Sequence, residues 1–360
     1  MHKLRTLTLV ASMGLIAVIV ASCGGSSTTG STGPSGKIGL LLPESKTARY
    51  ETKDRPLFTN KLKALCPNCT LLYNNANQDS SVQQTQAEAM LTNGVKVLVL
   101  DPVDGKSAAA IADKAKQQGV PVVSYDRLIL NTANVNFYIS FDNAKVGQLQ
   151  GTSLLTALGS KTNPSIVMIN GDPADNNAKL FKQGAHSVLD GKVQIKKEYD
   201  TPSWSPDKAH DEMAQALTAL GNKVDGVYAA NDGTGGGAIS AMVSAGVNPL
   251  PPVTGQDAEL AAIQRILAGQ QYMTVYKAIV PEAEQAAQLA FDLLTSASAS
   301  SMTNGKTTNN GTADVPSVLL NPVAVTKDNV KTTVVADGFW TKADICTGTY
   351  VAACTAAGIN

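Results

Sequence analysis

Polar side chains that can bind a hydroxyl-rich molecule follow many of the apolar, β-rich runs of this sequence. Carboxylates, amides, a guanidinium and an ammonium group can together donate hydrogen bonds to, and accept them from, several neighbouring hydroxyls. These groups stand at Tyr125, Asp126 and Arg127, at Asp142 and Asn143, from Asp172 to Asn177, at Asn231 and Asp232, at Gln256 and Asp257, and at Lys277. A single Asp or Asn after a strand is commonly a helix cap, and Asn143, Asn176 and Asp232 fit that structural role equally well. Because one chemistry recurs after strand upon strand, we predict a binding site for a polyol.

Strands and helices alternate along the first half of the chain and would bring these groups together. Strands are predicted at 37–43, 70–75, 95–102, 120–126 and 137–142, and helices at 55–65, 79–93 and 105–118. Continuous apolar strands that alternate with helices indicate a parallel sheet covered on both faces. The first half is therefore predicted to form one α/β lobe.

The same pattern then starts again. Strands are predicted at 165–171, 193–200, 224–231, 251–257 and 272–278, and helices at about 144–158, 176–189, 206–220, 234–245, 259–268 and 281–296. A Ser/Thr/Asn/Gly-rich loop is predicted over 297–313, before a last extended run. We predict two similar, doubly wound parallel-sheet lobes, with ligand chemistry at the carboxyl ends of their strands.

Length and charge fit a two-lobed α/β protein and argue against nucleic acid as a partner. The chain has 360 residues, more than one compact core usually supports. Lys and Arg together number 29, as do Asp and Glu, and no basic stripe stands out. Binding to phosphates needs a concentrated positive field.

Dinucleotide binding is a weak alternative. "NDGTGGGA" approaches the dinucleotide-binding pattern and lies between a strand and a helix. However, Asp232 would place a negative charge at the helix terminus meant for pyrophosphate. The glycine run more simply lets a helix approach the sheet or a ligand closely.

Catalytic alternatives are also weak. A Ser/His/Asp triad would need His186 or His210, which lie inside predicted amphipathic helices. Asp126 and Asp257 could in principle hydrolyse a glycoside as a carboxylate pair. The amides and cations beside them suit ionised carboxylates that bind a ligand better than one that stays protonated. We predict a binding protein without cofactor or metal, and not an enzyme.

The first residues have the layout of a secretory signal. A short basic start, an apolar stretch over 7–21 and "VASC" at 20–23 follow one another. Residues 1–23 are therefore predicted to form a lipoprotein signal that ends at a lipobox Cys, because "VASC" resembles the lipobox of bacterial lipoproteins, in which the cysteine becomes the lipidated first residue after cleavage. The Gly/Ser/Thr tether over 24–36 has no means of folding and favours this interpretation over an ordinary signal peptide or an uncleaved anchor. The body is expected outside the cytoplasm, anchored through Cys23.

The other cysteines predict disulfides. Of five cysteines, four remain if Cys23 carries lipid, and an even number in an oxidising compartment indicates two bridges. Cys66 and Cys69 in "CPNC" are close neighbours, as are Cys346 and Cys354, so local pairing is the simplest connectivity. A redox dithiol is an alternative for "CPNC", but that motif should open a helix after a strand. A zinc site would need further ligands, and the three histidines are scattered.

Six long blocks of the chain resemble a known family. They are "YDRLI", "NFYISFDNAKVGQLQG", "DNNAKLFKQG", "NDGTGGGAI", "GQDAELAAIQRILAGQQYMTVYK" and "TNNGTADVPSVLLNPVAV". These blocks closely resemble the ribose/galactose-type periplasmic binding proteins of bacterial ABC importers, and among them the xylose-binding members. The resemblance runs from about Lys37 to Trp340. It implies a three-segment hinge with crossings near residues 143, 279 and 321. The lobes would comprise 37–143 with 279–321 and 144–278 with 322–342, and 343–360 would form a disulfide-bonded tail.

The resemblance also implies which residues bind the sugar. They are Arg49, Asp126, Arg127, Asn177, Asn231, Asp257 and Lys277. Trp204 in "SWSP" falls on the position of an aromatic that stacks on the sugar ring. It is one of two tryptophans and lies in a polar loop outside the predicted hydrophobic core, although structural packing remains an alternative. Asp175 and Asn176 are expected to set the turn that presents Asn177.

Two features depart from the family pattern. Tyr50 stands where the family often has Trp, and "RYETKDR" is one residue longer than the usual spacing. Tyr50 can still stack on a sugar. The paired cysteines and the tail after Trp340 also lie outside the pattern.

The resemblance implies a monomeric, lipid-anchored solute-binding protein that captures a monosaccharide, with D-xylose favoured. It would deliver this sugar to the permease of an ABC importer. The alternatives are a sensor that presents the sugar to a chemoreceptor or kinase, a binder of another pentose or glucose, and an enzyme of the same fold.

Overall fold

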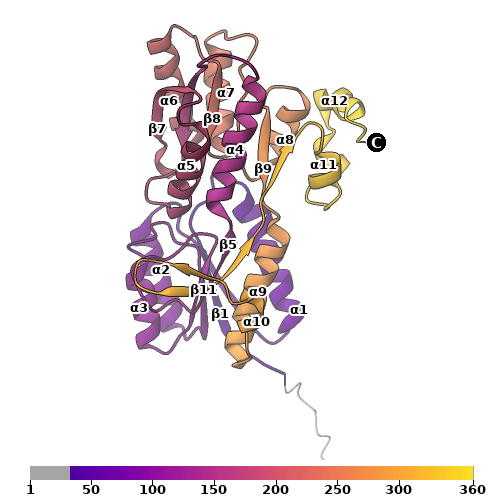
Figure 1. Ribbon diagram of the computed structural model, residues 1–360. Coiled ribbons are helices and arrows are strands. Elements are labelled where there is room, and N and C mark those ends of the chain that lie inside the picture. The colour runs from indigo at the N-terminus through magenta and orange to yellow at the C-terminus, as the bar shows by residue number, and fades with distance from the viewer. Residues whose placement is uncertain (1–32, 360) are drawn as a thin grey trace, which may run out of the picture. The chain divides into compact units, whose positions relative to one another are not determined.

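Two main sheets built largely from parallel strands, together with a small antiparallel one, form the framework of residues 33–359, the part of the chain that the computed structural model describes (Figure 1). The predictions for the signal segment 1–23, for Cys23 and for most of the 24–36 tether lie outside the described residues. Each sheet has apolar clusters on both faces, where helices cover it. The predicted doubly wound α/β architecture is therefore confirmed.

The N-terminal lobe contains a seven-stranded sheet in the order β10-β11-β5-β4-β3-β1-β2. Its strands are β1 (Lys37–Leu42), β2 (Thr70–Asn75), β3 (Val97–Leu100), β4 (Val122–Tyr125), β5 (Phe137–Phe141), β10 (Thr307–Asn309) and β11 (Asp314–Leu320). Its helices are η1 (Tyr50–Asp54), α1 (Arg55–Leu65), α2 (Ser80–Thr92), α3 (Ala109–Gln117), α9 (Ile279–Thr295) and α10 (Ser300–Thr303). All residues of β3 and β4 are buried, as expected for the centre of a sheet covered on both faces.

The C-terminal lobe contains a three-stranded sheet, β7-β6-β8, and a two-stranded one, β12-β9. Its strands are β6 (Ser165–Asn170), β7 (Gln194–Asp200), β8 (Gly226–Ala229), β9 (Met273–Tyr276) and β12 (Val323–Thr326). Its helices are α4 (Asn143–Leu158), α5 (Asn176–Leu189), η2 (Pro202–Trp204), α6 (Pro206–Leu220), α7 (Asp232–Ser244) and α8 (Leu260–Leu267).

Two local predictions were wrong. Segment 251–257 forms no strand, and only isolated bridges, Val253 to Val227 and Gln256 to Val275, connect it to β8 and β9. The prolines at its start cannot donate to a ladder, which shortens the pairing. The 297–313 segment is not only loop, because it contains α10 and β10, which pairs antiparallel with β11 at the sheet edge.

Three connections join the lobes. They run from β5 into α4, from β9 into α9 and from β11 into β12. Helix α4 packs against β8 and β9 of the C-terminal lobe, whereas α9 packs against α1 and β3 of the N-terminal lobe. The connections lie close to residues 143, 279 and 321, and their action as a hinge stays a prediction.

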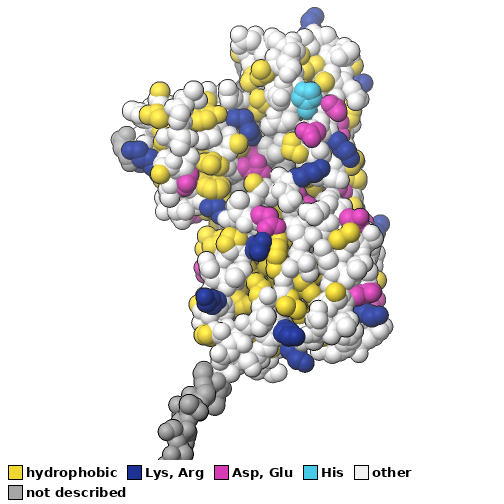
Figure 2. Space-filling model, turned by 180° about the vertical axis from the view of Figure 1, so that it is seen from behind, with side chains coloured by type: hydrophobic (Ala, Val, Ile, Leu, Met, Phe, Trp, Pro, Cys, Tyr) yellow, Lys and Arg dark blue, Asp and Glu magenta, His cyan; other side chains and the backbone are white. Residues whose placement is uncertain are grey.

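The tail after β12 consists of η3 (Lys331–Val335), α11 (Lys342–Ile345), η4 (Gly348–Tyr350) and α12 (Val351–Ala356). It protrudes beside the C-terminal lobe (Figure 2). The Cys346–Cys354 disulfide closes it, and Cys66–Cys69 is the second disulfide, located between α1 and β2. The predicted local pairing is therefore confirmed. Between residues 33 and 359, no helix is long and apolar enough to cross a membrane.

Candidate functional site

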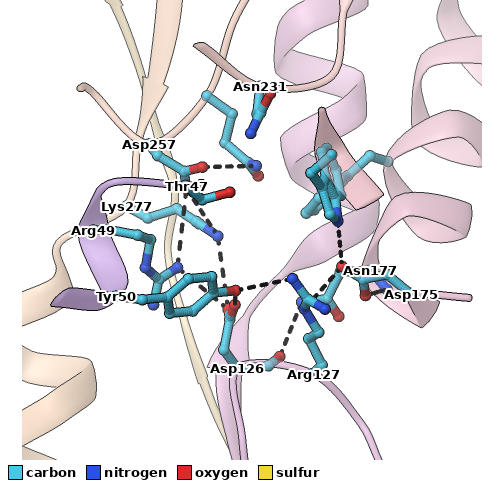
Figure 3. A pocket seen from close by; sticks show the side chains of 13 residues that line it. Thr47, Arg49, Tyr50, Asp126, Arg127, Asp175, Asn177, Asn231, Asp257 and Lys277 are labelled. Carbon is cyan, nitrogen blue, oxygen red and sulfur yellow. Dashed lines mark hydrogen bonds and ion pairs between the residues drawn. The ribbon is translucent and has the colours of Figure 1, made fainter. Parts of the chain in front are cut away.

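A small cavity lies between the two lobes and is lined by 13 residues (Figure 3). The lining includes every ligand-binding residue predicted from the sequence, namely Arg49, Tyr50, Asp126, Arg127, Asn177, Trp204, Asn231, Asp257 and Lys277. The remaining lining residues are Thr47, Asp175, Phe181 and Gln256. The side chains come from the carboxyl ends of strands in both lobes, as the fold class predicts.

Arg49, which follows β1, is held from behind by carboxylates of the N-terminal lobe. Its Nε and Nη2 donate to Asp54 at 3.0 and 2.6 Å, and Nη2 also donates to Glu282 at 2.7 Å. Tyr125 donates a hydrogen bond to the same Asp54 carboxylate. The guanidinium is therefore fixed in one orientation, with Nη1 left to face the cavity, 3.5 Å from Asp126 Oδ1.

The segment after Arg49, in "RYETKDR", forms a helical turn that is wider than an α turn. Residues 50–54 form the π-helix η1, in which the backbone N–H of Arg55 donates to the carbonyl oxygen of Tyr50. A π turn spans one residue more than an α turn and is frequent at functional sites. The turn keeps Tyr50 against the cavity, where its hydroxyl donates to Asp126 at 3.2 Å and accepts from Arg127 at 3.3 Å.

Asp126 is the centre of charge in the site. Burial by itself would raise the pKa of its carboxyl, but the charges of Arg49, Lys277 and Arg127 overcome this and lower that pKa below its ordinary range. Lys277 Nζ lies 3.6 Å from Asp126 Oδ1 and 3.1 Å from Asp257 Oδ1. Asp126 therefore stays ionised and acts as a hydrogen-bond acceptor.

Asp175 joins the two lobes. Its carboxylate caps α5 by accepting from the Asn177 N–H at 2.8 Å, so its predicted role in the turn is confirmed. The same carboxylate accepts from Trp204 Nε1 at 3.1 Å and lies 3.0 Å from Arg127 Nε of the N-terminal lobe. Figure 3 shows Asp175 and Asn177 across the cavity from Tyr50.

Asn177 is oriented by both lobes. Its Nδ2 donates to the backbone oxygen of Asp126 at 3.0 Å, and its Oδ1 accepts from Asn143 Nδ2 at 2.9 Å. Asn143 is buried and its Nδ2 is also 3.2 Å from Ser140 Oγ. Asn143 is therefore a support for Asn177 and not the helix cap.

The helix caps lie one residue earlier than the sequence suggested. Asp142 caps α4, Asp175 caps α5 and Asn231 caps α7. The proposed capping role of Asn143, Asn176 and Asp232 is therefore wrong. The preceding residues have the extended backbone of a cap, whereas these three stand at the first helical position.

Trp204 lies against the floor of the cavity. It is 4% exposed, and its ring packs edge-on against Phe181 with centroids 6.3 Å apart. Gly171 makes this position possible, because a Cβ there would lie 2.0 Å from the indole. Trp204 thus both packs and borders the cavity, so the two alternatives for it are compatible.

Backbone strain collects at the site. Asp126, Trp204 and Asp257 have φ values of 52°, 50° and 89°, which non-glycine residues rarely adopt. Such conformations cost about 1–3 kcal/mol each and persist where the surroundings impose them, often at ligand sites.

Several polar atoms around the cavity have no hydrogen-bond partner among the described residues. They include Arg49 Nη1, Asp126 Oδ1, Gln256 Oε1 and Asp257 Oδ1, all of them buried. Their ion-pair distances are 3.1 Å or longer, without hydrogen-bond geometry. Leaving such a group unpaired costs about 1–3 kcal/mol, so the arrangement suits a small neutral molecule with several hydroxyls. Within residues 33–359, no group of His, Cys, Asp and Glu could hold a metal ion.

The glycine run of α7 serves helix packing. A Cβ on Gly237 would lie 2.2 Å from the backbone oxygen of Pro206 in α6, and one on Gly235 would lie 3.1 Å from the Thr254 oxygen. This agrees with the close-approach interpretation of "NDGTGGGA". Asp232 is buried and accepts from Gln271 and Thr274, so it faces the interior of the lobe.

A family model described as a periplasmic binding protein domain matches residues 38–298. The chain belongs to this family. It is 41% identical over 314 residues to the D-xylose-binding periplasmic protein of Haemophilus influenzae, covering 86% of this chain and 92% of that one. The protein of the same name from Escherichia coli is 40% identical with the same coverage. A solute-binding protein of a carbohydrate transporter from Chloroflexus aurantiacus, solved in complex with D-glucose, superposes with a TM-score of 0.79 at 31% identity, over 87% of this chain and 98% of that one.

The family confirms the predicted resemblance, the fold and the assignment to binding proteins instead of enzymes. Sequence reasoning missed Thr47 and Phe181 as lining residues. Gln256 was visible as a polar residue at a strand end. Phe181 carries no such signal, because it continues the apolar face of a helix.

Proposed function

We propose that this protein binds a monosaccharide, with D-xylose favoured, outside the cytoplasm and delivers it to an ABC importer. The observation that carries the proposal is the set of unpaired, buried polar atoms that both lobes aim at one cavity. Its lining combines donors, acceptors and aromatic rings, which is the chemistry of sugar recognition. The names of the two D-xylose-binding relatives support xylose.

The sugar would lie between Trp204 and Tyr50, with its hydroxyls bound by the charged and amide groups. Arg49, Arg127 and Lys277 would donate, Asp126 and Asp257 would accept, and Asn177 and Asn231 can do both. An epimer moves one hydroxyl and leaves a buried group unpaired, at about 1–3 kcal/mol per group. Epimers of the preferred sugar should therefore bind much more weakly.

Glucose is a second candidate, favoured by the glucose complex of the Chloroflexus aurantiacus protein. Glucose keeps the hydroxyl arrangement of xylose and adds a hydroxymethyl group. Only steric exclusion can reject it, and Tyr50 in place of a larger Trp enlarges the space on that wall.

We further propose that Cys23 carries the lipid anchor. One acyl chain holds a protein to a membrane only marginally, so stable attachment needs at least two. Cys23→Ala should move the protein to the soluble fraction. Unchanged membrane retention, with no lipid on the mature terminus by mass spectrometry, would contradict this proposal.

Calorimetric titration with xylose, its epimers ribose, arabinose and lyxose, glucose and galactose tests the ligand. We expect the tightest binding for xylose, and recovery of the sugar unchanged. Tighter binding of ribose or galactose would reject xylose, and conversion of the sugar would reject a pure binding protein. Loss of uptake in a deletion strain would support delivery to an importer, whereas normal uptake would favour a sensor.

A further inference from the structure

Lys53 makes a contact outside the cavity with the segment that leads into the C-terminal tail. Its ammonium group lies 3.9 Å from the centre of the Trp340 ring and 4.7 Å from that of Phe339. It also donates a hydrogen bond to the backbone oxygen of Phe339 at 2.5 Å. One side chain thus makes two cation–π contacts and a charge-assisted hydrogen bond.

Phe339 and Trp340 are fixed to the C-terminal lobe. Trp340 Nε1 donates to the backbone oxygen of Ala258 at 2.8 Å, next to Asp257 of the site. Phe339 is 3% exposed, and its ring lies 5.2 Å from that of Tyr276 on β9.

The tail braces this position from the outer side. Gln264 of α8 donates to the backbone oxygen of Ile345 at 3.1 Å. Ile345 and Cys354 are buried in the same apolar cluster as Ile263 of α8 and Phe339. The Cys346–Cys354 disulfide closes the segment that carries these apolar residues. Figure 1 shows α11 and α12 beside α8.

Lys53, by contrast, belongs to the N-terminal lobe. It stands in η1, the π turn that carries Tyr50 at the cavity. The contact therefore joins the π turn of the N-terminal lobe to aromatic residues that are fixed to the C-terminal lobe.

We propose that Lys53 and the aromatic pair Phe339 and Trp340 form a latch that holds the two lobes closed. The proposal rests on the proposed function, because the latch retains a sugar enclosed between the lobes. Opening the lobes must break the latch, whereas the approach of a sugar to an open protein does not involve it. The latch therefore acts on the dissociation rate, and Lys53 is a positioning residue that also fixes the turn bearing Tyr50.

Stopped-flow measurement of xylose binding to the full chain tests the latch. Lys53→Met keeps an aliphatic stem over the rings but removes the charge and the hydrogen bond. We expect its dissociation rate to rise about fivefold, equivalent to about 1 kcal/mol, with an association rate within about twofold of the parent protein. Lys53→Arg keeps a cation and should restore most of the slow dissociation. Lys63→Met, at an exposed lysine of α1, is the matched control and should change neither rate.

The tail disulfide offers a second test. Replacing Cys346 and Cys354 together by Ser should speed xylose dissociation in the same direction, because the brace behind Phe339 and Trp340 loosens. Replacing Cys66 and Cys69 together by Ser removes the other disulfide, which lies at the C-terminal end of α1 whereas Lys53 precedes its N-terminal end, and should leave dissociation unchanged.

A measurement without sugar separates the latch from the proposed function. Small-angle scattering of the ligand-free proteins should give a larger radius of gyration for Lys53→Met than for the parent and for Lys63→Met. If the parent binds xylose and Lys53→Met leaves the dissociation rate unchanged, the latch is wrong and the function stands. If the parent binds no xylose, the assignment to xylose fails, and equal radii of gyration would then overturn the latch as well.

Discussion

The two walls of the cavity are built in different ways. On the N-terminal wall, Arg49 is tied to two buried carboxylates, Asp54 and Glu282, that do not reach the ligand space. On the C-terminal wall, Asn177 and Asn231 are neutral amides held by helix starts, and Trp204 supplies an aromatic surface.

Because of this difference, substitutions in the two walls should have different effects on folding stability and on sugar affinity. Removing a charge from the N-terminal wall leaves its buried partners without a counter-charge. Burial already raises the pKa of Glu282 well above its ordinary value, and the charge of Arg49 opposes that rise. A neutral group removed from the C-terminal wall leaves a smaller gap and no stranded charge. We therefore expect substitution of Arg49 to reduce mainly folding stability, and substitution of the neutral amides Asn177 and Asn231 to reduce mainly sugar affinity.

The largest effect is expected for Arg49→Met. It leaves Asp54 and Glu282 buried without their cation, and breaking a buried ion pair from one side costs about 3–5 kcal/mol of unfolding free energy. Chemical denaturation of the ligand-free protein measures this loss. An unfolding free energy within about 1 kcal/mol of the parent value would show that the N-terminal wall does not need the ion pairs of Arg49.

Asn177→Ala should show the opposite balance. A lost sugar hydrogen bond and a buried partner left unpaired cost about 1–3 kcal/mol, or roughly 5- to 150-fold in xylose affinity by calorimetry. Asn143 keeps Ser140 as a partner, so the unfolding free energy should fall by less than in Arg49→Met. Normal affinity combined with a large stability loss would make Asn177 a structural residue and erase the contrast between the walls.

Tyr50→Trp refines the comparison on the N-terminal wall. The larger ring should fill space beside the sugar and disfavour the hydroxymethyl group of glucose. We expect the ratio of xylose to glucose affinity to rise severalfold, with a smaller change in xylose affinity itself. The loss of the Tyr50 hydroxyl, which bonds Asp126 and Arg127, is controlled by Tyr50→Phe. An unchanged ratio in Tyr50→Trp would locate sugar selection on the other wall.

Sequence reasoning could find the cavity but not its second layer. Asp126, Asn177 and Lys277 stand at strand ends, where topology alone brings residues together, and the matching blocks identified them individually. Asp54 and Glu282 lie within helical segments, and only the three-dimensional fold places them behind Arg49. Their burial depends on packing between segments far apart in sequence, which periodicity does not specify.

The same limit applies to local geometry. The longer spacing after Arg49 could be noticed from the resemblance to the family, but the sequence does not distinguish a π turn from an irregular loop there. Segment 251–257 has the composition of a strand, yet it makes only isolated bridges, because pairing depends on neighbours that the segment itself does not determine.

The smallest expected effect concerns pH and lies on the C-terminal lobe, away from the cavity. His186 of α5 is partly buried, which alone would lower its pKa, but its contacts with Glu198 and Asp190, at 3.1 and 2.8 Å, raise that pKa above the ordinary value. A histidine whose pKa is higher in the folded state adds stability that is complete below about pH 6.5, its unfolded value, and is lost as pH rises through the raised folded value. The gain should stay below about 1 kcal/mol, because the site is largely exposed and screened. The melting temperature of the parent protein should therefore fall relative to His186→Asn as pH rises from 6 to 8, while His210→Asn follows the parent. Parallel curves for the parent and His186→Asn would contradict this expectation.

Xylose affinity should stay constant from pH 6 to 8, because Arg49, Lys277 and Arg127 keep Asp126 ionised throughout that range. An affinity that changed with pH in the same way as the melting temperature would mean that the region around His186 and the cavity are coupled.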